Sequence, residues 1–135
     1  MNPDNPIPVA AGLIFRDGQL LIAQRPAGKH LAGLWEFPGG KLEPGESWAA
    51  GLQRELRKEL GTEVDVGELF EEVEHRYPTK TVHLRFYVCR WLRGEPQPLE
   101  CAAVAWVTAA ELARYEFPPA DAQLLQRLQR GEKWG

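Results

Sequence analysis

The sequence has few cysteines, no long apolar segment and no leader-like start. Its two cysteines, Cys89 and Cys101, form no Cys-x-x-Cys pair, which excludes a disulfide framework and gives no indication of zinc. The longest apolar runs, residues 9–15 and 101–107, have seven residues each, too few to cross a bilayer. Residues 1–8 lack the basic start and apolar stretch of a signal peptide. We therefore expect a soluble cytoplasmic protein in which both cysteines are buried thiols.

The chain also lacks a strong net charge, although its charges are unevenly distributed. Its 16 basic and 19 acidic residues give a formal net charge of −3, which argues against duplex nucleic acid or an anionic membrane as a partner. Residues 36–74 nevertheless contain eleven acidic and four basic residues, a local charge of −7. The remainder of the chain therefore sums to +4. An acidic block inside a basic frame has to be explained by the function.

The 135 residues fit one domain, 1–135, with a single core. A hairpin is expected around Asp17-Gly18, because this dipeptide tolerates the positive φ angles of a tight turn. The expected strands are residues 9–15, 20–23, 64–73, 82–92 and 104–107. The expected helices are residues 47–60, ended by Gly61, and about 120–130, with a helical turn at 109–114. Because strands and helices interleave, we predict an α+β fold with a mixed sheet between helices.

The helix predicted over residues 47–60 carries two carboxylates beside its apolar face. At ~100° per residue, the apolar stripe consists of Ala49, Leu52, Leu56 and Leu60. Glu55 and Glu59, four residues apart, lie side by side on the border of this stripe. Like charges at this spacing repel each other, and more strongly where the core lowers the dielectric constant. Either Arg54 and Lys58 offset the repulsion, as on an ordinary helix surface, or a bound cation does.

The loop before this helix favours the cation. Gly39-Gly40 allows the backbone to bend sharply and expose its carbonyl groups. Glu43 and Glu46 add two more acids close to the start of the helix. Clustered carboxylates and carbonyls without nearby histidine or cysteine ligands suit a hard divalent cation, Mg²⁺ or Mn²⁺.

The same residues resemble the signature of the Nudix hydrolases: Gly, five residues, Glu, seven residues, Arg-Glu-aliphatic, one residue, Glu-Glu, one residue, Gly, aliphatic. The matching positions are Gly40, Glu46, Arg54, Glu55, Leu56, Glu59 and Gly61. Seven spaced matches over 22 residues make a highly specific pattern. The sequence departs from it twice, because Lys58 replaces the first glutamate of the Glu-Glu pair and Thr62 replaces the final aliphatic residue.

The resemblance extends from about residue 9 to residue 130 and is closest to the MutT branch, which includes the enzyme that removes 8-oxo-dGTP. Further matching residues are Gln24, Arg25, Pro26, His30, Trp35, Glu36, Phe37, Pro38, Gly39, Glu100, Trp106, Phe117, Pro118, Pro119, Ala120 and Asp121. The resemblance implies the Nudix fold and hydrolysis of a nucleoside triphosphate to the monophosphate and pyrophosphate with Mg²⁺ or Mn²⁺. A small nucleotide is thus the implied partner, and the oligomeric state stays open.

The resemblance also implies roles for individual residues. The implied metal ligands are the Gly39 carbonyl and the carboxylates of Glu55, Glu59 and Glu100. Either Glu55 or Glu100 would act as the general base toward water, and Arg54 would orient Glu55. Lys58 either places an ammonium group where a ligand is expected, so that the site binds metal more weakly, or points to solvent without effect.

The implied substrate residues lie outside the acidic block. Arg25, His30 and Lys80 would line the path of the triphosphate, and Phe117 and Asp121 would meet the base. The 8-oxo-dGTP enzyme has an asparagine where this chain has Asp121, and an ionised carboxylate only accepts hydrogen bonds. If Asp121 reads the base, a base with an exocyclic amino group, cytosine or adenine, becomes an alternative to guanine. The other possibility is that Asp121 only caps the helix that follows.

Two other functions stay open on the sequence alone. The protein could be a Nudix hydrolase for another diphosphate compound, such as a nucleotide sugar or a 5′-triphosphate RNA end. It could also be a nucleotide-binding module that has lost catalysis through Lys58. In each case the acidic block would hold the cation and the basic frame the phosphates.

Overall fold

The computed structural model describes residues 5–29, 31–132 and 134. Its strands are β1 (Ile7–Arg16), β2 (Gln19–Gln24), β3 (Trp35–Glu36), β4 (Gly39–Lys41), β5 (Glu63–Tyr77), β6 (Lys80–Arg93) and β7 (Ala103–Val107). Its helices are α1 (Trp48–Leu60) and α2 (Ala122–Gln129), with the short 3₁₀ helices η1 (Ala110–Arg114) and η2 (Pro119–Asp121). Among the described residues, none of the helices has the length and apolar character needed to span a membrane.

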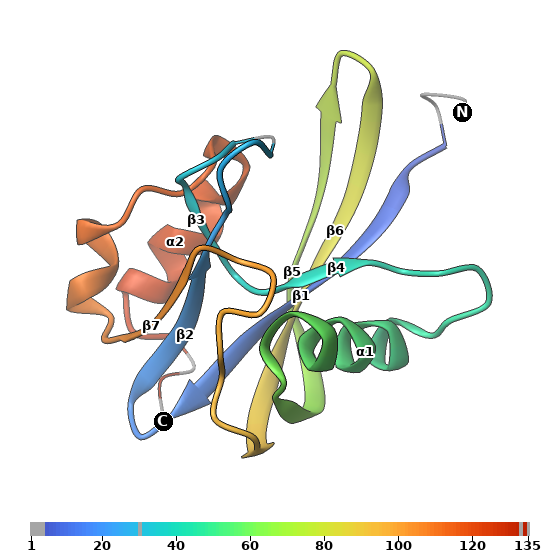
Figure 1. The fold of residues 1–135 in the computed structure, drawn as a ribbon. Helices are drawn as coiled ribbons and strands as arrows, with labels where there is room; N and C mark the ends of the chain where they lie inside the picture. Colours follow the sequence, from blue (N-terminus) through green and yellow to red (C-terminus); the bar gives the residue numbers. More distant parts are fainter. Residues whose placement is uncertain (1–4, 30, 133, 135) are drawn as a thin grey trace.

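The described strands form one mixed sheet in the order β3-β2-β1-β6-β5, with β4 also paired to β1 and β7 to β2. The β1–β6 pair is parallel and the other pairs are antiparallel. Leucines of α1 pack in one apolar cluster and leucines of α2 in another, and Figure 1 shows the two helices on opposite sides of the sheet. The predicted α+β fold with a mixed sheet between helices is confirmed.

The predicted hairpin at Asp17-Gly18 forms, and the strands expected over residues 64–73 and 82–92 form a second one. Asp17 and Gly18 have φ angles of 51° and 76°, and the turn they form connects β1 to β2. The β5–β6 hairpin is longer than expected, because the strands pair as far as Tyr77 and Lys80. This part of the hairpin projects at the top of Figure 1. Polar side chains fit here because exposed and less exposed residues alternate along β5.

The helix α1 begins and ends as its sequence predicts, but its buried face is rotated. Ser47 accepts a hydrogen bond from the Ala50 amide, and Gly61 ends the helix in the left-handed conformation. Ala49 is exposed, so its place in the predicted apolar stripe is wrong. The carboxylate-bearing Glu55 is instead within the buried face, only 8% exposed. The reason is close packing of α1 against β4.

Three further expectations need correction. The segment expected to bend at Gly39-Gly40 forms the strand β4, paired to β1. A side chain at position 39 would overlap the Ala10 carbonyl, so this close pairing requires glycine there. Cys89 is buried as expected, but Cys101 is only partly buried. The last helix starts at Ala122 because the preceding prolines favour a 3₁₀ turn.

Candidate active site

A cavity of about 320 Å³ lies over the parallel strands β1 and β6. Its floor includes Val9 and Leu84, which are partners in the β1–β6 pair. Gly40 of β4, Glu59 of α1 and Asp121 of η2 contribute to its wall. The cavity therefore brings the predicted metal-binding helix and the predicted base-reading residue together around an apolar floor.

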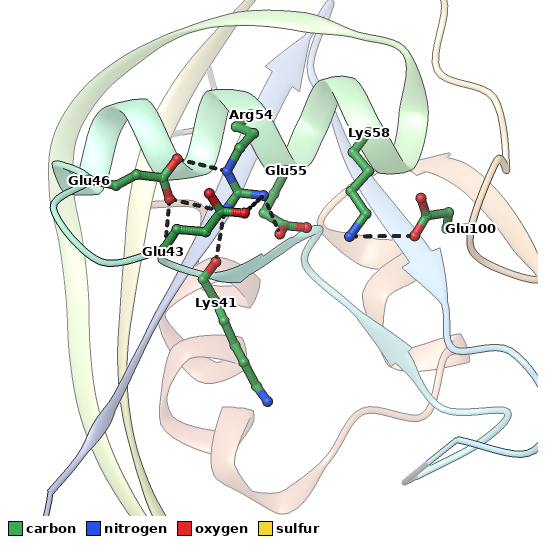
Figure 2. A network of polar contacts seen from close by, with 7 residues as sticks. All are labelled: Lys41, Glu43, Glu46, Arg54, Glu55, Lys58 and Glu100. Atoms are coloured by element: carbon green, nitrogen blue, oxygen red, sulfur yellow. Dashed lines mark hydrogen bonds and ion pairs between the residues drawn. The ribbon is translucent and has the colours of Figure 1, made fainter.

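Arg54 connects α1 to the loop before it and to β4 (Figure 2). Its guanidinium donates to Glu55 Oε1 at 2.9 Å and to Glu46 Oε2 at 2.7 Å. It also donates to the carbonyl of Lys41 at 3.0 Å. The bond from Arg54 to Glu46, together with a hydrogen bond from the Glu43 amide, keeps the pKa of Glu46 at about 2. Arg54 thus has the position expected of a residue that orients Glu55.

Gly40 makes room for the Glu55 carboxyl group. A methyl group at position 40 would lie 2.5 Å from Glu55 Cδ and 2.6 Å from Oε2. The carboxyl group therefore rests directly on the backbone of β4, next to the residue whose carbonyl is a candidate ligand, Gly39. The packing of α1 on β4 thus brings the Glu55 carboxyl group against the residue that follows Gly39.

The ionisation of Glu59 is affected by its burial and by the carboxylates around it. Burial, followed by the nearby charges of Glu36, Glu55 and Glu100, raises the pKa of Glu59 to about 8, although Lys58 acts in the opposite direction. Within the described residues, no three acidic, histidine or cysteine side chains already surround one point closely enough to hold a metal ion. Carboxylates that repel one another draw together around a divalent cation, so this oxygen-only set fits a hard metal that completes the site on binding.

Lys58 lies beside the last candidate ligand and not inside the cluster (Figure 2). Its Nζ is 3.9 Å from Glu100 Oε1, and its side chain is 56% exposed. Neither residue lines the cavity. The structure therefore combines the two alternatives for Lys58: the side chain is largely in solvent, and its charge still faces a candidate ligand.

Two of the predicted phosphate-binding residues, Arg25 and Lys80, line the cavity. Arg25 Nη1 lies 2.8 Å from Glu36 Oε1, and Lys80 Nζ lies 5.5 Å from the centre of the Tyr77 ring. The third predicted residue, His30, lies outside the described residues. The cavity thus has cationic groups on its wall in addition to carboxylates.

Asp121 and Phe117 occupy different environments. Asp121 is 6% exposed and lines the cavity. It stands at the capping position of α2 without a side-chain capping bond, so the alternative that it only caps this helix is wrong. Burial, followed by the charges of Glu36 and Glu71, raises the pKa of Asp121 to about 7. Phe117 does not line the cavity but stacks on Phe37, a lining residue, at 5.1 Å between ring centres.

Comparisons with known proteins agree with this site. Residues 10–127 match the model of the NUDIX domain. The chain is 43% identical to the CTP pyrophosphohydrolase of Escherichia coli over 89% of each chain, and 41% identical to the 8-oxo-dGTP diphosphatase of Haemophilus influenzae over 90% of each. The solution structure of the E. coli ORF135 protein superposes with a TM-score of 0.80 at 40% identity, covering 96% of this chain and 94% of that one.

The chain belongs to the Nudix hydrolase family. It is a MutT-like pyrophosphohydrolase, and Nudix hydrolases depend on a divalent metal ion. The resemblance stated from the signature residues is confirmed. The Nudix helix is α1, and Gly40, the first residue of the signature, lies on β4.

Sequence reasoning assigned no role to Glu36 or Tyr77, which both line this Nudix cavity. Glu36 lines it and contributes to the raised pKa of both Glu59 and Asp121. The available signal was an acidic residue between the aromatic residues Trp35 and Phe37. Tyr77 also lines the cavity, but the polar sequence around it gave no indication of a buried contact.

We expect Lys58→Glu to raise the affinity for the activating metal by about threefold to tenfold, because it replaces a cation facing Glu100 with a carboxylate. Activity measured against metal concentration at saturating nucleotide tests this. Arg57→Glu is the matched control, since Arg57 is also exposed on α1 but pairs with Glu63. Equal metal curves for the Lys58→Glu variant and the native protein would show that Lys58 has no part in metal binding.

Proposed function

We propose that the protein hydrolyses (deoxy)nucleoside triphosphates to the monophosphate and pyrophosphate, with Mg²⁺ as its metal and Mn²⁺ able to replace it. Oxidised or non-standard nucleotides such as 8-oxo-dGTP are the proposed substrates, and the cytoplasmic nucleotide pool is their source. The main support for this proposal is that one cavity brings the carboxylate of Glu59 together with the cationic side chains of Arg25 and Lys80. Residues 1–135 would form a single catalytic domain.

The proposed division of roles follows this arrangement. The Gly39 carbonyl, Glu55, Glu59 and Glu100 would hold the metal. When bound, a divalent metal neutralises the phosphates and lowers the pKa of a water molecule. Arg54 fixes the Glu55 carboxylate from behind, and either Glu55 or Glu100 takes a proton from the attacking water.

Arg25 and Lys80, which line the same cavity, would bind the phosphate chain. Arginine suits phosphate oxygens because its planar guanidinium donates two parallel hydrogen bonds. Lysine contributes a compact charge that also lies over the Tyr77 ring. His30 is the third proposed contact, and Phe117 would support the base through Phe37.

Asp121 would read the base in a way that depends on its protonation. An ionised carboxylate accepts hydrogen bonds only and suits the amino groups of cytosine or adenine, whereas the protonated acid both donates and accepts and suits the guanine edge. With its pKa raised to about 7, Asp121 takes the acid form below that pH and the carboxylate form above it. The relatives named for CTP and for 8-oxo-dGTP support both classes of base as substrates.

Pyrophosphate release tests the reaction directly, with dGTP, 8-oxo-dGTP, dCTP, 5-substituted dCTP and dATP as the panel and Mg²⁺ as the metal. We expect release from at least one triphosphate, and none without metal. Nucleotide binding without release would support the binding-module alternative. With a nucleotide sugar and a 5′-triphosphate RNA added to the panel, cleavage of these compounds alone would support the second enzymatic alternative.

Asp121→Asn should remove the pH dependence of base choice. Because the amide donates and accepts at every pH, the ratio of kcat/KM for 8-oxo-dGTP to that for dCTP should rise about tenfold at pH 8 and change little at pH 6. The same panel at the two pH values measures it, with the exposed Asp65→Asn as control. If the ratios stay equal to those of the native protein at both pH values, Asp121 does not read the base.

A further inference from the structure

Glu71 of β5 is a largely buried carboxylate, and one of its two oxygens has no hydrogen-bond partner among the described residues. Its side chain is 10% exposed, and Oε1 lies 3.1 Å from Arg127 Nη1 of α2. Its other oxygen, Oε2, is buried and makes no hydrogen bond with any residue that the structure describes. A buried, unpaired carboxylate oxygen is costly, so this arrangement calls for a reason beyond attaching α2 to the sheet.

Glu71 lies on the same face of the sheet as the floor of the cavity, next to one of its lining residues. It is the partner of Phe86 in the β5–β6 pair, and partners across an antiparallel pair project to the same face of the sheet. Phe86 lines the cavity whose wall contains Asp121. Arg127 stands on the helix that begins immediately after Asp121 and also donates to the Phe70 carbonyl at 2.7 Å. The Glu71–Arg127 pair therefore fixes a negative charge next to the element that carries Asp121.

The negative charges of two acidic residues from different strands act on Asp121. Glu36 of β3 is paired with Arg25, and Glu71 of β5 is paired with Arg127. Both negative charges oppose ionisation of Asp121, in addition to the effect of its burial. The Arg127 guanidinium is shared between Glu71 and Glu132, whose Oε1 lies 3.0 Å from Arg127 Nη2.

We propose that Glu71, held by Arg127, is a positioning residue that keeps Asp121 a hydrogen-bond donor and thereby sets which base the cavity accepts. This rests on the proposed function in one respect, the reading of the base by Asp121. The charge of Glu71 extends the pH range in which the guanine edge, with its carbonyl acceptor and N–H donor, is bound in preference to an exocyclic amino group. A purely structural anchor would not require this charge, because a glutamine would accept the same bond from Arg127.

The first test is the titration of the Asp121 carboxyl carbon, followed by NMR in the full-length protein without nucleotide. Glu71→Gln should lower its midpoint by about one pH unit, and Arg127→Gln should raise it, because the second change leaves Glu71 uncompensated. Mere loosening of α2 would expose Asp121 and lower the midpoint in both variants. An unchanged midpoint in Glu71→Gln, or shifts of the same sign in both variants, would overturn the proposal.

Glu72→Gln is the matched control, because it removes the same charge from the next residue of β5. Glu72 pairs with Arg85 and His83 instead of Arg127. This variant should leave the Asp121 midpoint unchanged. If Glu71→Gln does not fold, the proposal is tested by Arg127→Gln, which should raise the Asp121 midpoint. Glu71→Asp keeps the charge and should retain the native midpoint.

The second test separates this proposal from the base-reading role. At pH 7, Glu71→Gln should lower the ratio of kcat/KM for 8-oxo-dGTP to that for dCTP by about fivefold, and Glu72→Gln should not. If the midpoint shifts but the ratio does not, the reading of the base by Asp121 is wrong while the effect of Glu71 on Asp121 stands. If neither changes, Glu71 only anchors α2.

Discussion

Glu55→Gln is expected to lower kcat for nucleotide hydrolysis by about a thousandfold at saturating nucleotide. The amide has the same size as the carboxyl group and can still accept the bond from Arg54, whose Nη1 lies 2.9 Å from Glu55 Oε1. What it loses is the negative charge, which both proposed roles of Glu55 require. Steady-state kinetics with Mg²⁺ measures the loss. A kcat within tenfold of the native value would exclude Glu55 as ligand and as base.

The metal dependence of this variant distinguishes the two roles. If Glu55 is mainly a ligand, activity should recover in part as the Mg²⁺ concentration is raised, and Glu100→Gln should show the larger loss at saturating metal. If Glu55 is the base, raising the metal concentration should not help. Glu63→Gln is a suitable control, because Glu63 follows α1 and pairs only with Arg57 on the surface in the described contacts.

The order of elements was predictable because each depends on local signals. The hairpin at Asp17-Gly18, the Ser47 cap and the Gly61 end of α1 all follow from the backbone preferences of single residues. The strand β4 was not predictable, since its two glycines show no alternation. It forms because β2 pairs with β1 only at Phe15 and Arg16, so residues 9–11 of β1 are left to pair with β4, where position 39 has no room for a side chain.

The site was predictable where the signature fixes the spacing, and not where distant segments meet. Helical periodicity placed Glu55 and Glu59 together, but it set Glu55 at the border of the apolar stripe because periodicity carries no information about β4. Glu36 and Glu71 acquire their effect on Asp121 only through the pairing of β3 and β5 with the remainder of the sheet. No local pattern in the sequence contains those contacts.

Gly40→Ala is expected to lower kcat/KM by about a hundredfold while the protein stays folded. The added methyl group would lie 2.5 Å from Glu55 Cδ, so the carboxyl group has to leave its place on β4. Displacing a catalytic group by about 1 Å costs activity of this order. Overpacking of this kind costs about 1–3 kcal/mol of folding free energy, which a urea unfolding curve measures beside the kinetics.

A second substitution shows whether the loss arises at Glu55. In the double variant Gly40→Ala, Glu55→Asp, the shorter side chain leaves room for the methyl group, so activity should exceed that of Gly40→Ala alone. Gly18→Ala is the control for stability, because Gly18 has a φ of 76° and no heavy atom would lie within 4 Å of the added methyl group. It should lose stability without loss of kcat/KM, since strain at a distant turn leaves the cavity unchanged. An equal loss of activity in both single variants would mean that Gly40 matters for folding alone and that its contact with Glu55 is incidental.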